Sequence, residues 1–250
     1  MKYIFYIAFV VLFFGCNSEN ANDCFQAEGT IIQEEFIVEH FDKILVMERV
    51  RLIIKQGDEQ KVVLETGDNL LNDVEVSVTN GELKIINNNA CNLVRDYLIT
   101  KVFVTSPNII QIRNSTGYQV ESIGTLSYPE LTLLSENFEN EDLYRTDGDF
   151  QLSLSVNSLH VLANGLSNFF LSGSANNVTI NFYAGDSRLE AENLIIQNLN
   201  IDHRGTNKML VNPQQSIQGV IRSGGDVISY NRPLIVDVEE LYTGRLIFQD

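Results

Sequence analysis

Carboxylates are the residues of this chain best able to do chemistry, and many gather in one segment, "ENFENEDLYRTDGD" (residues 136–149). Paired carboxylates carry out glycoside hydrolysis, and carboxylate oxygens are ligands that Ca²⁺ prefers. The candidates are Glu136, Glu139, Glu141, Asp142, Asp147 and Asp149. The segment has neither the nonapeptide repeat of calcium-binding β-rolls nor the spacing of an EF-hand loop. Acid clusters in loops are usually solvated, so we predict no enzyme and no cofactor, while a structural calcium ion stays open.

The other side chains capable of catalysis show no informative spacing. His40, His160 and His203 lie far apart in the sequence, without the spacing of metal ligands. The nucleophile motif G-x-S-x-G is absent, and the serines of "LSGSA" (residues 171–175) are typical of a turn. These observations favour a protein that binds rather than one that reacts.

The N-terminus indicates the compartment. Lys2 precedes an apolar run from Tyr3 to Phe14, which is too short to cross a bilayer core of about 30 Å as a helix. Gly15 and Cys16 close the run, and this order is typical of a secretory signal. "LFFGC" also resembles a bacterial lipobox. The alternatives are an uncleaved anchor and ordinary signal cleavage.

From this pattern we predict a lipoprotein signal peptide over residues 1–15, then a lipidated Cys16 and a polar tether over residues 16–34. The chain would be held to the outer membrane by its N-terminal lipid, facing the periplasm or the outside. Cys24 and Cys91 then remain as an even pair in an oxidising compartment, which predicts one disulfide. Two buried free thiols are the alternative.

The charge of the chain limits its partners. The formal net charge is −16, and an acidic surface repels phosphate backbones. We therefore predict no binding to nucleic acid.

Short alternating strands dominate the first half. "DVEVSVTNGELKII" (residues 73–86) is the clearest hairpin, because Asn80-Gly81 favours a type I′ turn between two alternating segments. No window of 11 or more residues carries a convincing helical period, so we predict strands throughout the mature chain.

The second half repeats with a period near 20 residues. The repeats align on four predicted turn glycines, Gly165, Gly185, Gly205 and Gly224. The residues four and six positions later are apolar or small and are predicted to face inward: Phe169, Leu189, Met209 and Ile228, then Leu171, Ala191, Val211 and Tyr230. A second strand follows in each unit, and its offset from the turn varies by about one residue. Stacked units of this kind bury one continuous core.

The predicted fold is therefore all-β. We expect a right-handed parallel β-helix, or β-solenoid, with coils of about 20 residues. Antiparallel strands over residues 36–105 would cap one end, and residues 236–250 would form capping strands at the other.

Several segments, in this order, resemble the auto-transporter adhesin head GIN domain family. They are "VLETGDNLL" (63–71), "VTNGELKI" (78–85), the cysteine-bearing insert "NNNACNLVRDY" (87–97), "LSGSANNV" (171–178) and "GDVISYNRP" (225–233). The resemblance covers residues 35–235, which we predict to be one head GIN-like β-solenoid domain. It implies an envelope protein of Bacteroidetes-like bacteria without established catalysis, and it makes adhesion a hypothesis.

The predicted function is a non-catalytic binding or adhesion module on a cell-envelope lipoprotein, with an unidentified glycan or protein as ligand. Aromatic side chains of the repeats are mostly expected in the core, whereas Phe170 and Tyr183 are expected outside and could contact a ligand. The alternatives are an architectural subunit of an envelope assembly and, less favoured, a carbohydrate-active enzyme.

Overall fold

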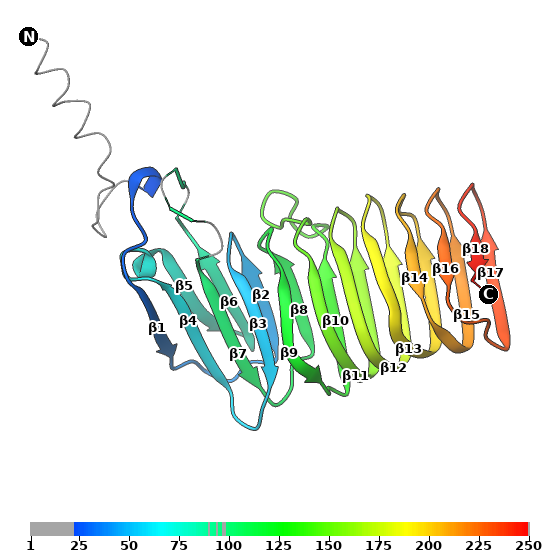
Figure 1. The fold of residues 1–250 in the computed structure, drawn as a ribbon, viewed down its shortest axis with the longest axis horizontal. Coiled ribbons are helices and arrows are strands. Elements are labelled where there is room, and N and C mark those ends of the chain that lie inside the picture. The colour runs from blue at the N-terminus through cyan, green and yellow to red at the C-terminus, as the bar shows by residue number, and fades with distance from the viewer. Residues whose placement is uncertain (1–22, 90, 94, 97–98, 250) are drawn as a thin grey trace, which may run out of the picture.

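The computed structural model describes residues 23–89, 91–93, 95–96 and 99–249. The predicted signal peptide and Cys16 lie outside these residues. The body is an elongated stack of strands whose long axis runs from β1 to β18 (Figure 1). Among the described residues, no helix is long and apolar enough to span a membrane.

Two short 3-10 helices and eighteen strands make up the described chain. The elements are η1 (Asp23–Phe25), β1 (Ile31–Phe36), β2 (Lys43–Met47), β3 (Arg51–Gln56), β4 (Lys61–Gly67), η2 (Asp68–Asp73), β5 (Val74–Thr79), β6 (Glu82–Asn87), β7 (Lys101–Ser106), β8 (Gln111–Ser115), β9 (Val120–Leu126), β10 (Glu130–Ser135), β11 (Phe150–Ala163), β12 (Asn168–Phe182), β13 (Arg188–His203), β14 (Met209–Val211), β15 (Pro213–Ile221), β16 (Val227–Ser229), β17 (Ile235–Glu240) and β18 (Leu246–Phe248).

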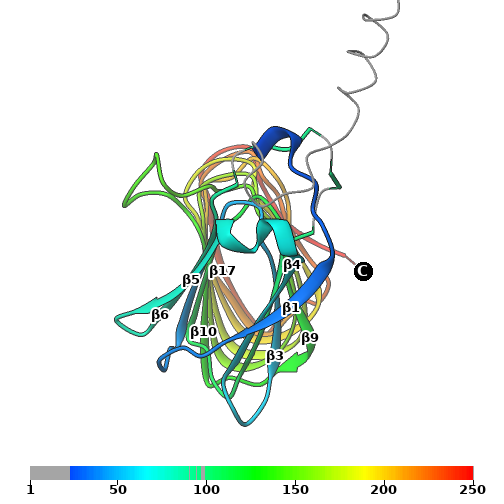
Figure 2. The same ribbon diagram turned by 90° about the vertical axis from the view of Figure 1, so that its left-hand side faces the viewer.

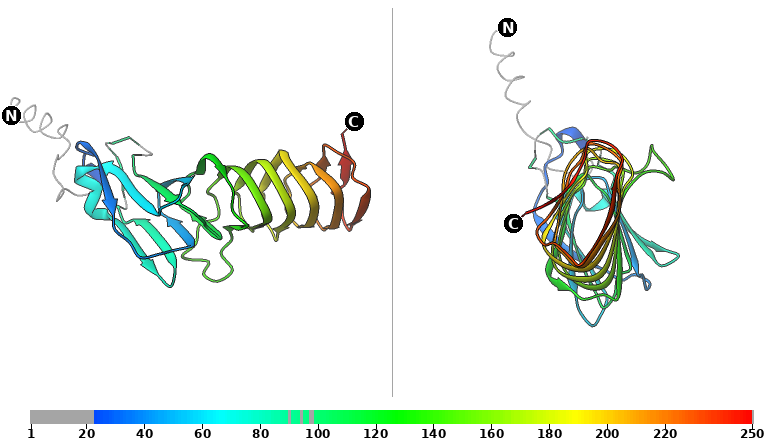
Figure 3. Two further views of the ribbon diagram at one scale, coloured as in Figure 1. Left: turned by 90° about the horizontal axis from the view of Figure 1, so that it is seen from below. Right: turned by 90° about the vertical axis from the view of Figure 1, so that its right-hand side faces the viewer.

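All eighteen strands belong to one sheet that wraps around a single core. The first part of β11 pairs with β9 and its last part with β10, so one long strand serves both sides of the body. Viewed along the axis, β9 and β10 lie on opposite sides of a flattened ring (Figure 2). We call these two sides the β9 wall and the β10 wall. Figure 3 shows the later strands following one another along the axis.

The expected all-β class is found, but the expected parallel β-helix with an antiparallel cap is wrong. The sheet has mixed pairing and closes into a flattened, nearly complete barrel: β1–β4, β4–β7 and β5–β6 are antiparallel. The segment expected to be an antiparallel cap instead contributes β2 and β3, which pair in parallel with β6 and β8 and with β7 and β9. Alternation of apolar and polar residues is common to both kinds of pairing, so the sequence pattern could not separate them.

The core is a column of inward side chains. Phe150 stacks on Phe169 with ring centroids 4.9 Å apart, Phe169 lies 5.7 Å from Phe182, and Phe182 meets His203 edge-on at 5.8 Å. These four side chains are fully buried. Parallel pairing in register places Phe169 over Phe150 and His203 over Phe182, whereas Phe169 and Phe182 come from opposite ends of β12 and meet inside the core. Burial of such aromatic surface is a main source of stability.

The predicted turn glycines lie at the corners of the wrapped sheet, but for different reasons. Only Gly185 of the four has a positive φ, of 80°, and a Cβ on Gly165 would come within 2.1 Å of Thr146. The frame predicted from Gly224 is one residue out. Val227 and Ser229 are the buried residues of β16, and Tyr230, expected inside, is 42% exposed.

Candidate binding groove

The acid-rich loop 136–149 stands out from the body beside the β10 wall (Figure 2). Glu136 is buried and its Oε1 lies 2.8 Å from Nη2 of buried Arg113, which also packs over the ring of Tyr144. Asp149 Oδ1 accepts hydrogen bonds from the backbone and side-chain nitrogens of Asn168. These two acids therefore fix the ends of the loop.

The remaining loop acids do not form a site. Glu139 lies 4.0 Å from Arg113, whereas Glu141, Asp142 and Asp147 face solvent. In the described part of the chain, no three His, Cys, Asp or Glu side chains lie close enough together to hold a metal ion.

The three histidines are also kept apart. The Nδ1 atom of His40 lies 2.9 Å from Oε1 of Gln60, and His160 is exposed on the β10 wall. His203 is buried in the aromatic column, with Nε2 3.0 Å from the carbonyl oxygen of Asn207. Burial lowers the pKa of His203, because the charged imidazolium would lose its hydration.

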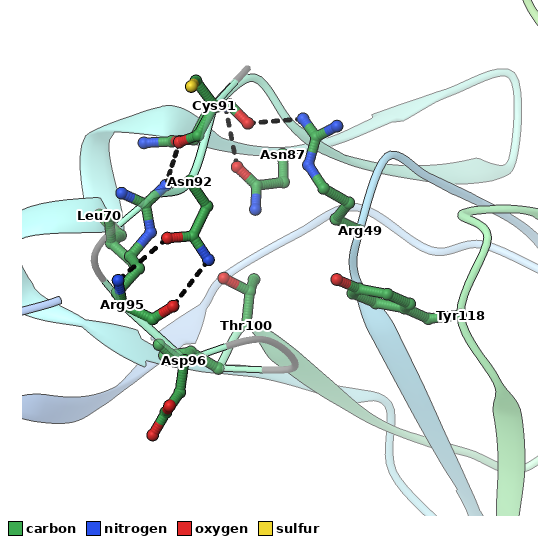
Figure 4. Close-up of a pocket in the computed structure, with 11 residues that line it drawn as sticks. Arg49, Leu70, Asn87, Cys91, Asn92, Arg95, Asp96, Thr100 and Tyr118 are labelled. Carbon is green, nitrogen blue, oxygen red and sulfur yellow. Dashed lines mark hydrogen bonds between the residues drawn. The ribbon is translucent and has the colours of Figure 1, made fainter. Parts of the chain in front are cut away.

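A disulfide joins Cys24 to Cys91 at the β1 end of the body. Cys91 borders a cavity of about 220 Å³, shown in Figure 4. Arg95 reaches across it and donates hydrogen bonds to the carbonyl oxygens of Gln26 and Cys91, both at 2.9 Å. Arg49 donates to the carbonyl oxygen of Asn89 at 2.5 Å. Much of the polar lining is thus engaged in holding the cysteine-bearing segment against the body.

A second depression, of about 320 Å³, hollows the β9 wall. We call it the Phe170 groove. It is lined by Ser122, Gly124, Gln151, Leu152, Ser153, Phe170, Leu171, Ser172, Glu190, Glu192 and Asn193. Gln151, Phe170 and Glu190 are in register on three neighbouring strands, so their side chains leave the wall side by side.

Two β-bulges shape this groove. On β9, three residues lie between Glu121 and Thr125, whose partners on β11, Gln151 and Ser153, are separated by one residue. On β13, Glu192 and Asn193 lie between two buried residues, where regular alternation would place one. Bulges bend a strand and redirect its side chains, and they often border functional sites.

The bulge on β9 is stabilised by a side chain. Ser122 Oγ accepts the hydrogen bond of the Ser153 backbone N–H at 2.9 Å, in place of a carbonyl oxygen of the ladder. Gly124 has a φ of 74°, a conformation that favours glycine, and a Cβ there would meet open space. The local sequence therefore allows the strand to swing away and opens the wall.

Glu192 is the residue of the groove with an unmet requirement. Its Oε2 atom is buried and has no hydrogen-bond partner. A buried carboxylate oxygen without a donor costs free energy, and a ligand hydroxyl or amide could recover it by drawing the side chain out into the groove. Glu190, by contrast, pairs with Arg188 at 2.7 Å.

The sequence placed two aromatic residues correctly outside the core, one of them in this groove. Phe170 is partly exposed in the groove, and Tyr183 is 37% exposed at the corner after β12, where its ring meets Phe138 edge-on at 5.2 Å. Glu190 lies between two positions that were predicted to face inward, so its outward direction follows from alternation, whereas Glu192 was missed. The extra residue of the β13 bulge explains why the offset between the turn and the second strand of each repeat varies by about one residue.

The comparisons with known proteins agree on the fold. The chain is similar to a "putative adhesin" from Bacteroides fragilis, with a TM-score of 0.78 and 18% identity over 89% of this chain and 99% of that one. It is similar to a "Putative lipid binding protein" from Parabacteroides distasonis, with a TM-score of 0.60 and 14% identity over 90% and 99% of the two chains. A "putative adhesin" from Parabacteroides merdae gives a TM-score of 0.57 and 16% identity over 90% and 98%.

No curated protein matches the chain. The family described as "Putative auto-transporter adhesin, head GIN domain" matches residues 40–233, which is most of the chain and includes both walls. The resemblance drawn from the sequence motifs is thereby confirmed: the chain belongs to the auto-transporter adhesin head GIN domain family.

Proposed function

We propose that this chain is a non-catalytic binding module of the cell envelope that holds a saccharide in the Phe170 groove. The observation that carries the proposal is the unpartnered, buried Oε2 atom of Glu192 beside an aromatic ring that faces out of the wall. An aromatic face packs against the C–H side of a pyranose, and carboxylates and amides bind its hydroxyl groups. Gln151, Ser172 and Asn193 supply further donors and acceptors around the ring.

The envelope location rests on the family and on the N-terminal sequence. The description of the family as an adhesin head fits a place at the cell surface, and the "LFFGC" motif supports attachment through a lipid on Cys16. Metabolic labelling with a palmitate analogue tests this part separately. Label is expected in the wild type and lost in Cys16→Ser, and label retained by the variant would contradict lipidation.

The saccharide proposal is tested by glycan-array screening of the mature domain, followed by calorimetry with the short oligosaccharides that bind. Phe170→Ala and Glu192→Gln are each expected to weaken binding about tenfold or more, because each removes a contact that the ligand needs. Phe103→Ala is the matched control. Phe103 is a partly exposed phenylalanine on β7 of the same wall, outside the groove, and its loss should leave affinity unchanged.

The outcomes separate the candidate functions. A folded wild type that binds no glycan on the array, or a Phe170→Ala variant with unchanged affinity, overturns the proposal. Because one structural relative bears the name of a lipid-binding protein, phosphatidylglycerol vesicles form a second arm, and binding there alone would also count against a saccharide. A stoichiometric protein partner recovered from membranes, with no glycan bound, would support an architectural subunit instead.

A further inference from the structure

The β10 wall carries a straight row of outward polar side chains. One residue from each of six neighbouring strands contributes, and parallel pairing keeps all of them in register. We call this row the polar ladder; its members are Gln111, Thr132, His160, Thr179, Asn200 and Gln218. All are partly or fully exposed, and within the described chain their side chains have no hydrogen-bond partner in the protein.

The adjacent row behaves differently. Two residues earlier on each strand, the side chains bond to one another: Asn198 donates to Asn177 at 3.3 Å and accepts from Ser216 at 3.0 Å. One position before this row, Asn176 donates to Asn157 at 3.0 Å. This second row satisfies itself and serves the fold. The polar ladder leaves its donors and acceptors for something outside the protein.

The spacing of the ladder selects an extended ligand. Neighbouring strands lie about 4.8 Å apart, so hydrogen-bonding groups recur along the wall at that interval. This repeat is close to the length of one pyranose unit in an extended β-linked chain. The same-face repeat of an extended peptide is about 6.7 Å and falls out of step with it. Six side chains in line can therefore meet hydroxyl groups on successive sugar units.

The surroundings of the ladder agree with a neutral polymer. A shallow groove of about 400 Å³ runs over Gln111, Thr132 and His160, and is bordered by Asn181. At the corner just after β12, the exposed ring of Tyr183 packs against exposed Phe138. The six members of the ladder carry no charge, but the same register continues to Lys43 at one end and Asp237 at the other, and Glu130 also lines the groove. Hydrogen bonds to a neutral polymer are therefore the contacts that the six residues themselves offer.

We infer that the polar ladder is a second saccharide-binding surface, which takes a neutral, extended, β-linked polysaccharide lying across the strands. The inference stands on residues of the opposite wall and does not rest on the Phe170 groove. The strength of binding grows with the number of sugar units in contact, because each strand adds one similar, weak set of hydrogen bonds.

Affinity electrophoresis in native gels containing mixed-linkage β-glucan or glucomannan tests the inference. The wild type should be retarded by at least one of these polymers. The affinity of the combined variant Thr179→Ala, Asn200→Ala, Gln218→Ala for the polymer should be at least about tenfold lower. Its thermal midpoint should stay within a few degrees of the wild type, because these side chains have no partner in the fold to lose.

The matched control is Asn198→Ala, which lies two residues from Asn200 on the same strand. It removes the bonds to Asn177 and Ser216, so it should lower stability while leaving retardation unchanged. Phe170→Ala should also leave retardation by the long polymers intact, and the combined ladder variant should keep the short-oligosaccharide affinity of the groove. The two proposals can thus fail separately.

Three results would overturn the inference. The first is no retardation of the wild type in either polymer. The second is a combined ladder variant that is retarded as strongly as the wild type. The third is an Asn198→Ala variant that is folded but loses retardation to the same extent as the combined variant. Each of these outcomes would mean that the free hydrogen-bonding groups of the ladder do not hold a polysaccharide.

Discussion

Replacement of Glu136 by glutamine tests how the loop 136–149 is held. The change keeps the shape of the side chain and its acceptor for the Phe138 backbone N–H, but it removes the charge facing Arg113. Both side chains of the pair are less than a tenth exposed, at 8% and 9%. Breaking a buried ion pair by removing one partner costs about 3–5 kcal/mol. Glu139 lies 4.0 Å away with a largely exposed side chain and is too solvated to replace the lost charge.

Urea unfolding followed by far-ultraviolet circular dichroism measures the loss, since the chain has no tryptophan. Adding Arg113→Met to Glu136→Gln should recover much of the stability, because no unpaired charge is then left in the interior. Glu35→Gln is the matched control: its partner Lys61 lies 2.6 Å away, but both side chains are about half exposed. That variant should change stability by less than about 0.5 kcal/mol. A Glu136→Gln cost below about 1 kcal/mol, or a double variant as unstable as the sum of the singles, would refute the reasoning.

Two further predictions concern the covalent clamp and the buried histidine. Replacing Cys24 and Cys91 by serine should lower the free energy of unfolding by about 4 kcal/mol, which is the chain-entropy value for a disulfide that spans 67 residues. Urea unfolding of the oxidised wild type and of the variant measures the difference. Equal midpoints would show that the disulfide does not stabilise the fold. His203 has a lowered pKa in the folded state, so the unfolded chain binds the proton more readily and stability falls as pH drops below about 6.5. His203→Gln should therefore show a flatter stability profile between pH 7 and pH 5, and a profile as steep as that of the wild type would place the titrating group elsewhere.

Local pattern sufficed to predict what depends on alternation alone. The inward positions of Phe169, Leu171 and Leu189 and the outward position of Phe170 follow from the period of two within a strand. The fourth repeat failed because Met209 lies four residues after Gly205, whereas its partner Val227 lies only three residues after Gly224. A one-residue shift in a strand exchanges its inner and outer faces, which is why Tyr230 was placed inside.

The groove needed three-dimensional information. Its bulges come from extra residues on β9 and β13. In the sequence, such extra residues are visible only as an irregular spacing of the repeat. Whether strands pair in parallel or antiparallel depends on partners far along the chain, so β2 and β3 could not be assigned from their own residues. That the side chains of the polar ladder have no hydrogen-bond partners can likewise be seen only when the residues around them in the fold are known.

The direction of the backbone hydrogen bonds has a mechanical consequence. They run along the axis of the body, so tension along that axis acts on one pair of strands after another, in series. Within each pair of strands, the backbone hydrogen bonds share the load. The β11–β12 ladder alone joins 13 residue pairs. A pull entering from the N-terminal side of Cys24 passes through the disulfide to Cys91, between β6 and β7, and so bypasses β1. The edge strand that would otherwise peel first is thereby removed from the path of the force.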